Sequence, residues 1–172
     1  KATLAVPGVE LKRAAPTYRR LPERGAAFLT HGDRPHACRE GAAYRSMTFY
    51  HEMTATEVVE DIRQGHRTVH ALLGRPPSGF RAPHFGLFQG RAQLALLHRT
   101  VAELGCRYSS STLPGHSAWH GPIYRSTGIF EIPVSGVYES PLEVFDSCGY
   151  LTDRVTLRLS DSLRAAGWSD PV

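Results

Sequence analysis

Two short segments of the chain carry side chains that could bind a metal ion or support acid–base chemistry. The first holds His31 and His36, with four residues between them, and His51 follows as an alternative to His36. A neutral imidazole is the commonest protein ligand for zinc-like metals, and two histidines need a third ligand, usually Asp, Glu or His. The spacing is not the i, i+4 spacing that aligns two side chains on a helix, so it also fits two unrelated loop histidines. A metal pair is therefore one of two interpretations at this point.

The second segment carries Arg81 and His84 on either side of Pro83. Arg81 lies at an apolar strand end, where an unpaired charge would cost on the order of several kcal/mol, so we expect a carboxylate partner. A carboxylate held by an arginine beside a metal suits general-base catalysis, and the alternative is a structural ion pair. Pro83 restricts the backbone and would present the N–H of His84 in one direction, as an oxyanion donor requires.

Both segments follow apolar stretches that predict β-strands. The expected strands are 2–6, 26–30, 78–83, 106–109 and 129–134. The helical character between the first two is typical of a βαβ unit, and therefore of a parallel sheet in an α/β protein. In such sheets and barrels the carboxyl ends of the strands share one face, where ligands bind. We therefore expect His31, the segment 81–84 and the segment 109–112 to converge.

Helical periodicity marks the segments between these strands. The expected helices are 9–21 with an interruption near Pro16, 54–73 with a capping box at its start, 90–104, and 155–166. The expected end of the helix 54–73 is Gly74, which is followed by two prolines. The stretches 33–50 and 110–128 have no clear period, so both predict irregular connections.

Composition indicates one globular domain over residues 1–172. The chain is 41% hydrophobic and 21% charged, which is close to the average for soluble proteins and argues against disorder. The net charge of +4 comes from scattered arginines, with no run longer than Arg19-Arg20, so we expect no nucleic-acid partner. No apolar run approaches the roughly 20 residues that span a membrane.

Cysteine usage and the first residues bear on the cellular compartment. Cys38, Cys106 and Cys148 form no CxxC pair and leave one over, so the fold is not expected to depend on disulfides. No signal peptide is visible. The chain begins at Lys1 without a methionine, which suggests a processed or truncated segment. The location is unknown from the sequence, and it is cytoplasmic if this start is native.

The stretch 2–135 resembles the polysaccharide deacetylase family, which is carbohydrate esterase family 4 or the NodB homology domain. Gly25-Ala-Ala-Phe-Leu-Thr-His31-Gly resembles the strand that leads to the family's metal-binding histidine motif. Pro77-Ser-Gly-Phe-Arg-Ala-Pro-His84 is similar to its Arg-x-Pro-aromatic motif, and residues 129–135 fit a later strand. The resemblance implies an irregular (β/α) barrel of the deacetylase type, which we expect to be incomplete.

The resemblance also implies a metal-dependent hydrolase that removes acetyl groups from acetylated glycans, with a divalent ion that is commonly zinc. It implies that His31 is the first metal ligand and that the second is His36 or His51. The family's second histidine usually falls one place earlier than His36, where this chain has Pro35. Arg81 would orient the catalytic base, and the backbone N–H of His84 would hold the developing oxyanion.

Two motifs of the family are not found in the chain. The Asp-Asp motif, which supplies the base and the metal-binding Asp, would precede Lys1. The Leu-x-His motif of the general acid is not recognisable after Val134. The alternative to an enzyme is therefore a non-catalytic deacetylase-like domain that binds a glycan or a protein partner.

Overall fold

The computed structural model describes residues 2–41, 43–137 and 140–144. Its strands are β1 (Thr3–Val6), β2 (Ala27–Thr30), β3 (Ala37–Glu40), β4 (Ala43–Ser46), β5 (Gly79–Phe80), β6 (Tyr108–Ser109), β7 (Tyr124–Ser126), β8 (Ile129–Glu131), β9 (Gly136–Val137) and β10 (Ser140–Val144). Its α-helices are α1 (Gly8–Arg13), α2 (Ala15–Arg20), α3 (Ala55–Leu73), α4 (Arg91–Glu103) and α5 (Gly115–His120). Three short 3-10 helices are η1 (Pro22–Arg24), η2 (Tyr50–Glu52) and η3 (Phe85–Leu87).

The main sheet has the strand order β1-β2-β5-β6-β8-β7. All neighbours pair in parallel except β7, which pairs antiparallel with β8 at the edge. The parallel strands follow the order of the chain with no reversal. Because βαβ crossovers are right-handed, this order places successive helices on one face of the sheet, as in a barrel. The expected α/β fold, an incomplete (β/α) barrel, is confirmed.

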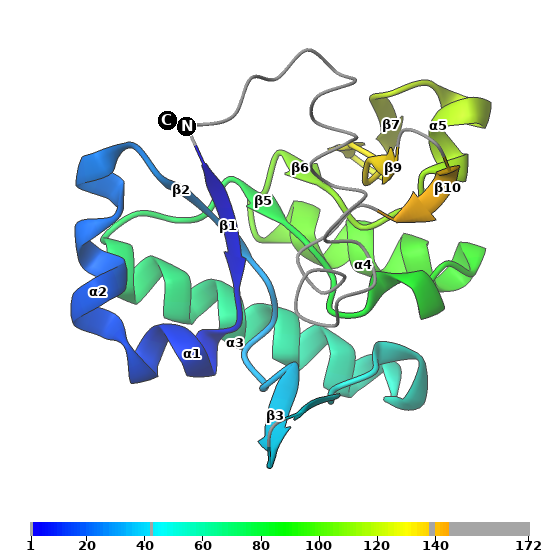
Figure 1. Ribbon diagram of the computed structural model, residues 1–172. Helices are drawn as coiled ribbons and strands as arrows, with labels where there is room; N and C mark the ends of the chain where they lie inside the picture. Colours follow the sequence, from blue (N-terminus) through cyan, green and yellow to red (C-terminus); the bar gives the residue numbers. More distant parts are fainter. Residues whose placement is uncertain (1, 42, 138–139, 145–172) are drawn as a thin grey trace.

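Helix α3 connects the histidine segment to β5 and forms the base of the structure. Figure 1 shows α3 running beneath the sheet beside α1 and α4. The predicted capping box is present, since the Thr54 hydroxyl accepts from the Glu57 N–H and the Glu57 side chain accepts from the Thr54 N–H. Gly74 ends the helix in the left-handed conformation, with φ of 69°.

Two apolar clusters form the core. The larger one joins α3, α4 and the strands β5 and β8 through residues such as Ile62, Phe80, Leu97 and Ile129. The smaller one joins α1, β2 and α3. Within the described residues, no helix combines the length and the apolar character needed to cross a bilayer. Cys38 and Cys106 are free thiols.

Two predicted connections contain secondary structure. The stretch 33–50 holds the antiparallel hairpin β3–β4 and the start of η2, and the stretch 110–128 holds α5 and β7. Both predictions of irregular structure were wrong, because no residue of α5 or β3 is buried and neither element therefore shows an apolar period. The predicted strand 78–83 is shorter, with only Gly79 and Phe80 in the sheet. The predicted helix 155–166 lies outside the described residues.

Candidate metal-binding and catalytic site

Strands β2, β5 and β6 end side by side at one edge of the sheet. Thr30 pairs with Phe80, and Phe80 pairs with Ser109. The Arg81 N–H continues this pairing by donating to the Thr30 carbonyl at 2.9 Å. The residues that follow these three strands therefore meet at one edge, as the sequence predicted.

His31 and His36 lie next to each other beyond β2, in residues 31–36, which we call the histidine loop. Their ring centroids are 4.2 Å apart. His31 Nδ1 lies 2.7 Å from the Arg81 carbonyl oxygen, which can only accept, so Nδ1 carries the proton and Nε2 keeps its lone pair. His36 Nε2 is buried and has no hydrogen-bond partner among the described residues. A buried polar atom without a partner requires an explanation, and a bound ion or water molecule is one.

Both imidazoles are neutral at physiological pH. Burial lowers the pKa of His31 to about 4, partly opposed by its hydrogen bond to the Arg81 backbone and reinforced by the charges of Arg81 and His84. Burial also lowers the pKa of His36 to about 2, with smaller contributions from His31 and His84. The neutral imidazole is the form that binds a metal ion, so this pair fits a divalent cation such as zinc.

His84 connects the turn after β5 to the histidine loop. Its ring Nε2 donates to the His36 carbonyl oxygen at 3.0 Å, and its ring centroid lies 4.7 Å from that of Phe49. Its backbone is left-handed, with φ of 40° and ψ of 44°. This conformation costs a residue with a Cβ on the order of 1–2 kcal/mol, and such strain clusters at functional sites. The oxyanion role of the His84 N–H stays a prediction.

Arg81 contacts groups on two different segments. Its Nη2 donates to the Ser110 hydroxyl at 2.9 Å, and its guanidinium carbon lies 5.7 Å from the centre of the Phe85 ring. The side chain therefore links the end of β5 to the residues after β6. The carboxylate partner expected for Arg81 stays a prediction.

His51 contacts Phe49 and Glu52. Its ring centroid is 5.7 Å from that of Phe49, and its Nε2 is 3.7 Å from a carboxylate oxygen of Glu52. The ring that lies beside His31 is that of His36. Of the two alternatives for a second ligand, the geometry therefore favours His36.

Three solved structures resemble the chain over nearly all of its length. One from Mycobacterium smegmatis, assigned as a polysaccharide deacetylase, has a TM-score of 0.58 and 19% identity over 96% of this chain and 55% of that chain. One from Pseudomonas aeruginosa PAO1 with the same assignment has a TM-score of 0.54 and 15% identity over 96% and 51%. The chain has the polysaccharide deacetylase fold. PuuE allantoinase shares it, with a TM-score of 0.53 and 14% identity over 93% and 50%.

The chain spans about half the length of these structures. No protein-family model matches it, and no curated protein matches it. At these identities the comparisons establish only the fold. The chemistry has to be inferred from the residues of this chain.

In the described part of the chain, His31 and His36 have no third candidate ligand beside them. Within residues 2–41, 43–137 and 140–144, no three His, Cys, Asp or Glu side chains gather to hold a metal ion. The acid nearest in sequence is Asp33, inside the histidine loop. Its carboxylate instead accepts from Lys12 Nζ at 2.8 Å and from the Thr68 hydroxyl at 2.7 Å.

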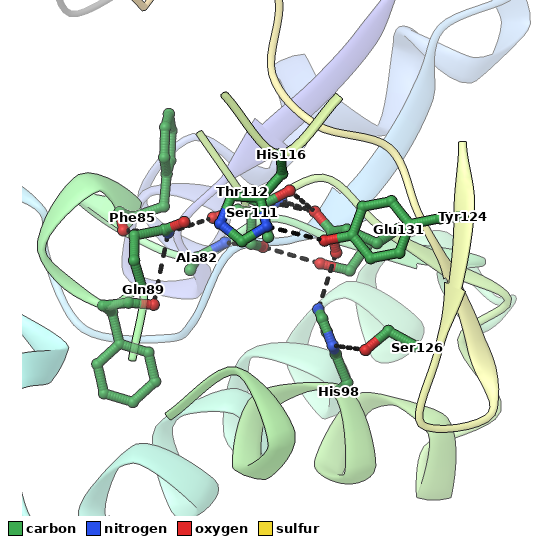
Figure 2. A network of polar contacts seen from close by, with 12 residues as sticks. Ala82, Phe85, Gln89, His98, Ser111, Thr112, His116, Tyr124, Ser126 and Glu131 are labelled. Carbon is green, nitrogen blue, oxygen red and sulfur yellow. Dashed lines mark hydrogen bonds and ion pairs between the residues drawn. The ribbon is translucent and has the colours of Figure 1, made fainter. Parts of the chain in front are cut away.

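A buried hydrogen-bond network holds the turn that follows β6. Its central residue, Glu131, was not predicted from the sequence. Glu131 on β8 is fully buried, and one of its oxygens accepts from the backbone N–H groups of Ser111 and Thr112 at 2.7 and 2.9 Å. His98 Nε2 donates to the other oxygen at 2.9 Å. Figure 2 shows Glu131 between His98 and this turn. The available signal was its inward position, two residues after Ile129 in a short strand.

The same network reaches the segment that carries Arg81 and His84. The Ser111 hydroxyl accepts from the Ala82 N–H at 3.0 Å. The Gln89 amide donates to the carbonyl oxygens of Phe85 and Ser111 at 2.7 and 2.9 Å, and its oxygen accepts from the Leu113 N–H at 3.2 Å. Figure 2 shows Gln89 beside Phe85 and the Ser111 turn. Glu131 thus supports the segment that carries Arg81 and His84 through its hydrogen bond to Ser111.

Proposed function

We propose that this chain carries the histidine ligands of a divalent-metal-dependent hydrolase that removes acetyl groups from an N-acetylated polysaccharide or a related glycan. The observation that supports this most directly is the His31–His36 pair. The rings lie 4.2 Å apart, both are neutral, and a buried His36 nitrogen has no hydrogen-bond partner among the described residues. The proposal is also supported by the position of both histidines after the end of β2, since barrel enzymes bind their substrates at the carboxyl ends of the strands.

Zinc is the metal that we propose for the site. Bound there, it would supply a Lewis acid that activates water and polarises the acetyl carbonyl. His31 and His36 would hold it, and the hydrogen bond from His31 Nδ1 to the Arg81 carbonyl would fix the ring orientation. Carboxylates would supply the third ligand and the catalytic base, as the family resemblance implies.

Two further residues would act on the substrate side of the reaction. The left-handed backbone of His84 would direct its N–H toward the acetyl oxygen as negative charge develops there. Arg81, held by Ser110 and Phe85, would orient the carboxylate that removes a proton from the attacking water. The bond broken would be a carbon–nitrogen bond outside a peptide backbone.

The experiment is calorimetric zinc titration of the protein, followed by an acetate-release assay on chitin oligosaccharides. We expect His31→Ala and His36→Ala each to abolish stoichiometric zinc binding and acetate release. His51→Ala is the matched control, since it removes a histidine of the same neighbourhood, and it should leave both unchanged. Zinc binding that survives loss of His31 and His36 would contradict the proposal.

A non-catalytic glycan-binding domain is the alternative, and Trp119 favours it. This side chain on α5 is 85% exposed, and close by the rings of His120 and Tyr124 lie 4.7 Å apart. Exposed aromatic rings of this kind can stack on sugars. If Trp119→Ala abolishes chitin-oligosaccharide binding while the loss of both His31 and His36 leaves the binding unchanged and acetate release is absent in every protein, the alternative holds.

A further inference from the structure

Asp61 is a buried carboxylate that the proposed chemistry does not use. It lies on α3 and is 4% exposed. Its Oδ1 accepts from the backbone N–H groups of Asp33 and Arg34, at 3.0 and 2.9 Å. Its Oδ2 accepts from the Tyr50 hydroxyl at 2.7 Å. A buried charge requires hydrogen bonds of this kind, and two of the three come from the histidine loop.

Those two donors lie between the candidate metal ligands. Asp33 and Arg34 separate His31 from His36, and none of these residues belongs to a helix or strand. The carbonyl groups of Gly32, Asp33 and His36 accept backbone hydrogen bonds from Gly8, Val9 and Met47. The N–H groups in the middle of the loop have their acceptor in Asp61. The Asp61 carboxylate supplies a fixed acceptor for the middle of the loop. It therefore restricts the backbone between His31 and His36.

Two other residues of α3 bring the helix against the same loop. A Cβ built on Gly65 would lie 2.4 Å from the Gly32 carbonyl group, so the glycine permits the close approach. The Thr68 hydroxyl donates to the Asp33 carboxylate at 2.7 Å. Positions 61, 65 and 68 are spaced i, i+4 and i+7, which places them on one face of the helix. The loop therefore rests on a continuous stripe of α3.

We propose that Asp61 is a positioning residue that sets the affinity of the His31–His36 pair for a divalent metal ion, an inference that rests on the proposed function. Without the carboxylate, the loop would sample arrangements in which the two rings are apart. Metal binding would then have to order the loop, and the affinity would fall. Partners that orient metal ligands typically change affinity by about 10- to 100-fold when they are removed.

The test compares zinc affinities by calorimetry in the full chain for wild type, Asp61→Ala and Asp61→Asn. We expect Asp61→Ala to weaken binding by about 10- to 100-fold. Asp61→Asn should restore most of the affinity, because the amide oxygen can still accept from Asp33 and Arg34 while its NH₂ group donates to Tyr50. Leu97→Ala is the control for destabilisation alone, since Leu97 is fully buried on α4 and is not part of the loop, and it should keep the wild-type affinity.

Hydrogen exchange of the Asp33 and Arg34 amides is measured in the same variants without metal. Protection should be lost in Asp61→Ala and kept in Asp61→Asn and Leu97→Ala. Equal zinc affinity in wild type and Asp61→Ala, or equal weakening in Leu97→Ala, overturns the role of Asp61 and leaves the histidine pair standing. A wild-type protein that binds no zinc overturns the proposed metal pair itself, and the Asp61 proposal with it.

Discussion

Asp61 and Glu131 are two buried carboxylates that each bind successive backbone N–H groups of a loop at the strand ends. Asp61 Oδ1 accepts from Asp33 and Arg34, and Glu131 Oε1 accepts from Ser111 and Thr112. Their second oxygens differ in partner. Asp61 accepts from a tyrosine hydroxyl, whereas Glu131 accepts from the imidazole of His98.

The difference lies in what each carboxylate connects. Glu131 sits within the sheet, and its hydrogen bonds join β8 to α4 and to the turn after β6. Asp61 reaches from a helix to a loop whose residues lie outside the strands. We therefore expect loss of Glu131 to affect mainly stability, and loss of Asp61 to affect mainly the geometry of the histidine pair.

The largest effect is expected for Glu131→Ala. Two backbone N–H groups, the Thr112 hydroxyl and His98 would lose their acceptor in the core. We expect the free energy of unfolding to fall by about 3–5 kcal/mol, as for a buried polar network that loses one member. Urea unfolding followed by circular dichroism measures this change. A loss no larger than that of a surface substitution would show that the Glu131 network adds little to stability.

The second prediction concerns the close approach of α3 to the histidine loop. Gly65→Ala places a methyl group where a Cβ would lie 2.4 Å from the Gly32 backbone. We expect a loss of about 1–3 kcal/mol from overpacking, although alanine favours a helix by about 1 kcal/mol relative to glycine. Gly86→Ala is the matched control, because the nearest atom to its Cβ would be 3.8 Å away. Thermal unfolding of both variants should show a lowered midpoint only for Gly65→Ala.

The third prediction uses the pH dependence of the Glu131 network. Burial raises the pKa of Glu131, but hydrogen bonds from His98, Ser109 and the Ser111 backbone outweigh it and lower the pKa below the usual 4.5. A folded-state pKa below the unfolded one stabilises the protein fully above pH 4.5, and this contribution is lost as the pH falls through the folded value.

Glu131→Gln removes this titration while keeping the shape of the side chain. The difference in unfolding free energy between wild type and Glu131→Gln should therefore be constant above pH 4.5 and shrink below it. Because glutamine retains an acceptor for Ser111 and Thr112, we expect a smaller difference than for Glu131→Ala. A difference that stays constant into acid would mean that the carboxylate is not preferentially ionised in the folded state.

The sequence predicted the scaffold better than the groups that orient the site. Helix α3 was predictable because its capping box, its apolar face and Gly74 all indicate the same boundaries. The convergence of the strand ends followed from the parallel order. Asp61 and Glu131 were missed, because a single acidic residue inside an apolar pattern looks like a solvated position until its partners, distant in sequence, are known.

The histidine pair illustrates the same limit. Spacing alone left His36 and His51 as alternatives, and it favoured neither. The arrangement of the loop that carries His31 and His36 depends on contacts from Asp61 on α3 and from His84. Both residues lie 25 or more positions away from His36 in the chain. Tertiary hydrogen bonds of this kind leave no periodic signal in a local stretch of sequence.

The smallest effect is expected for Lys12→Ala. This variant removes a partner of the Asp33 side chain and leaves the hydrogen bond of the Asp33 backbone in place. The Lys12 ammonium lies 2.8 Å from the Asp33 carboxylate, but its side chain is 51% exposed. We expect a loss of only about 0.2–1 kcal/mol in unfolding free energy, as for other surface ion pairs. The backbone N–H of Asp33 still donates to Asp61 in this variant, so zinc affinity should stay at the wild-type value in calorimetry. A drop comparable to that of Asp61→Ala would transfer the positioning role from the Asp61 hydrogen bonds to the charge on Asp33.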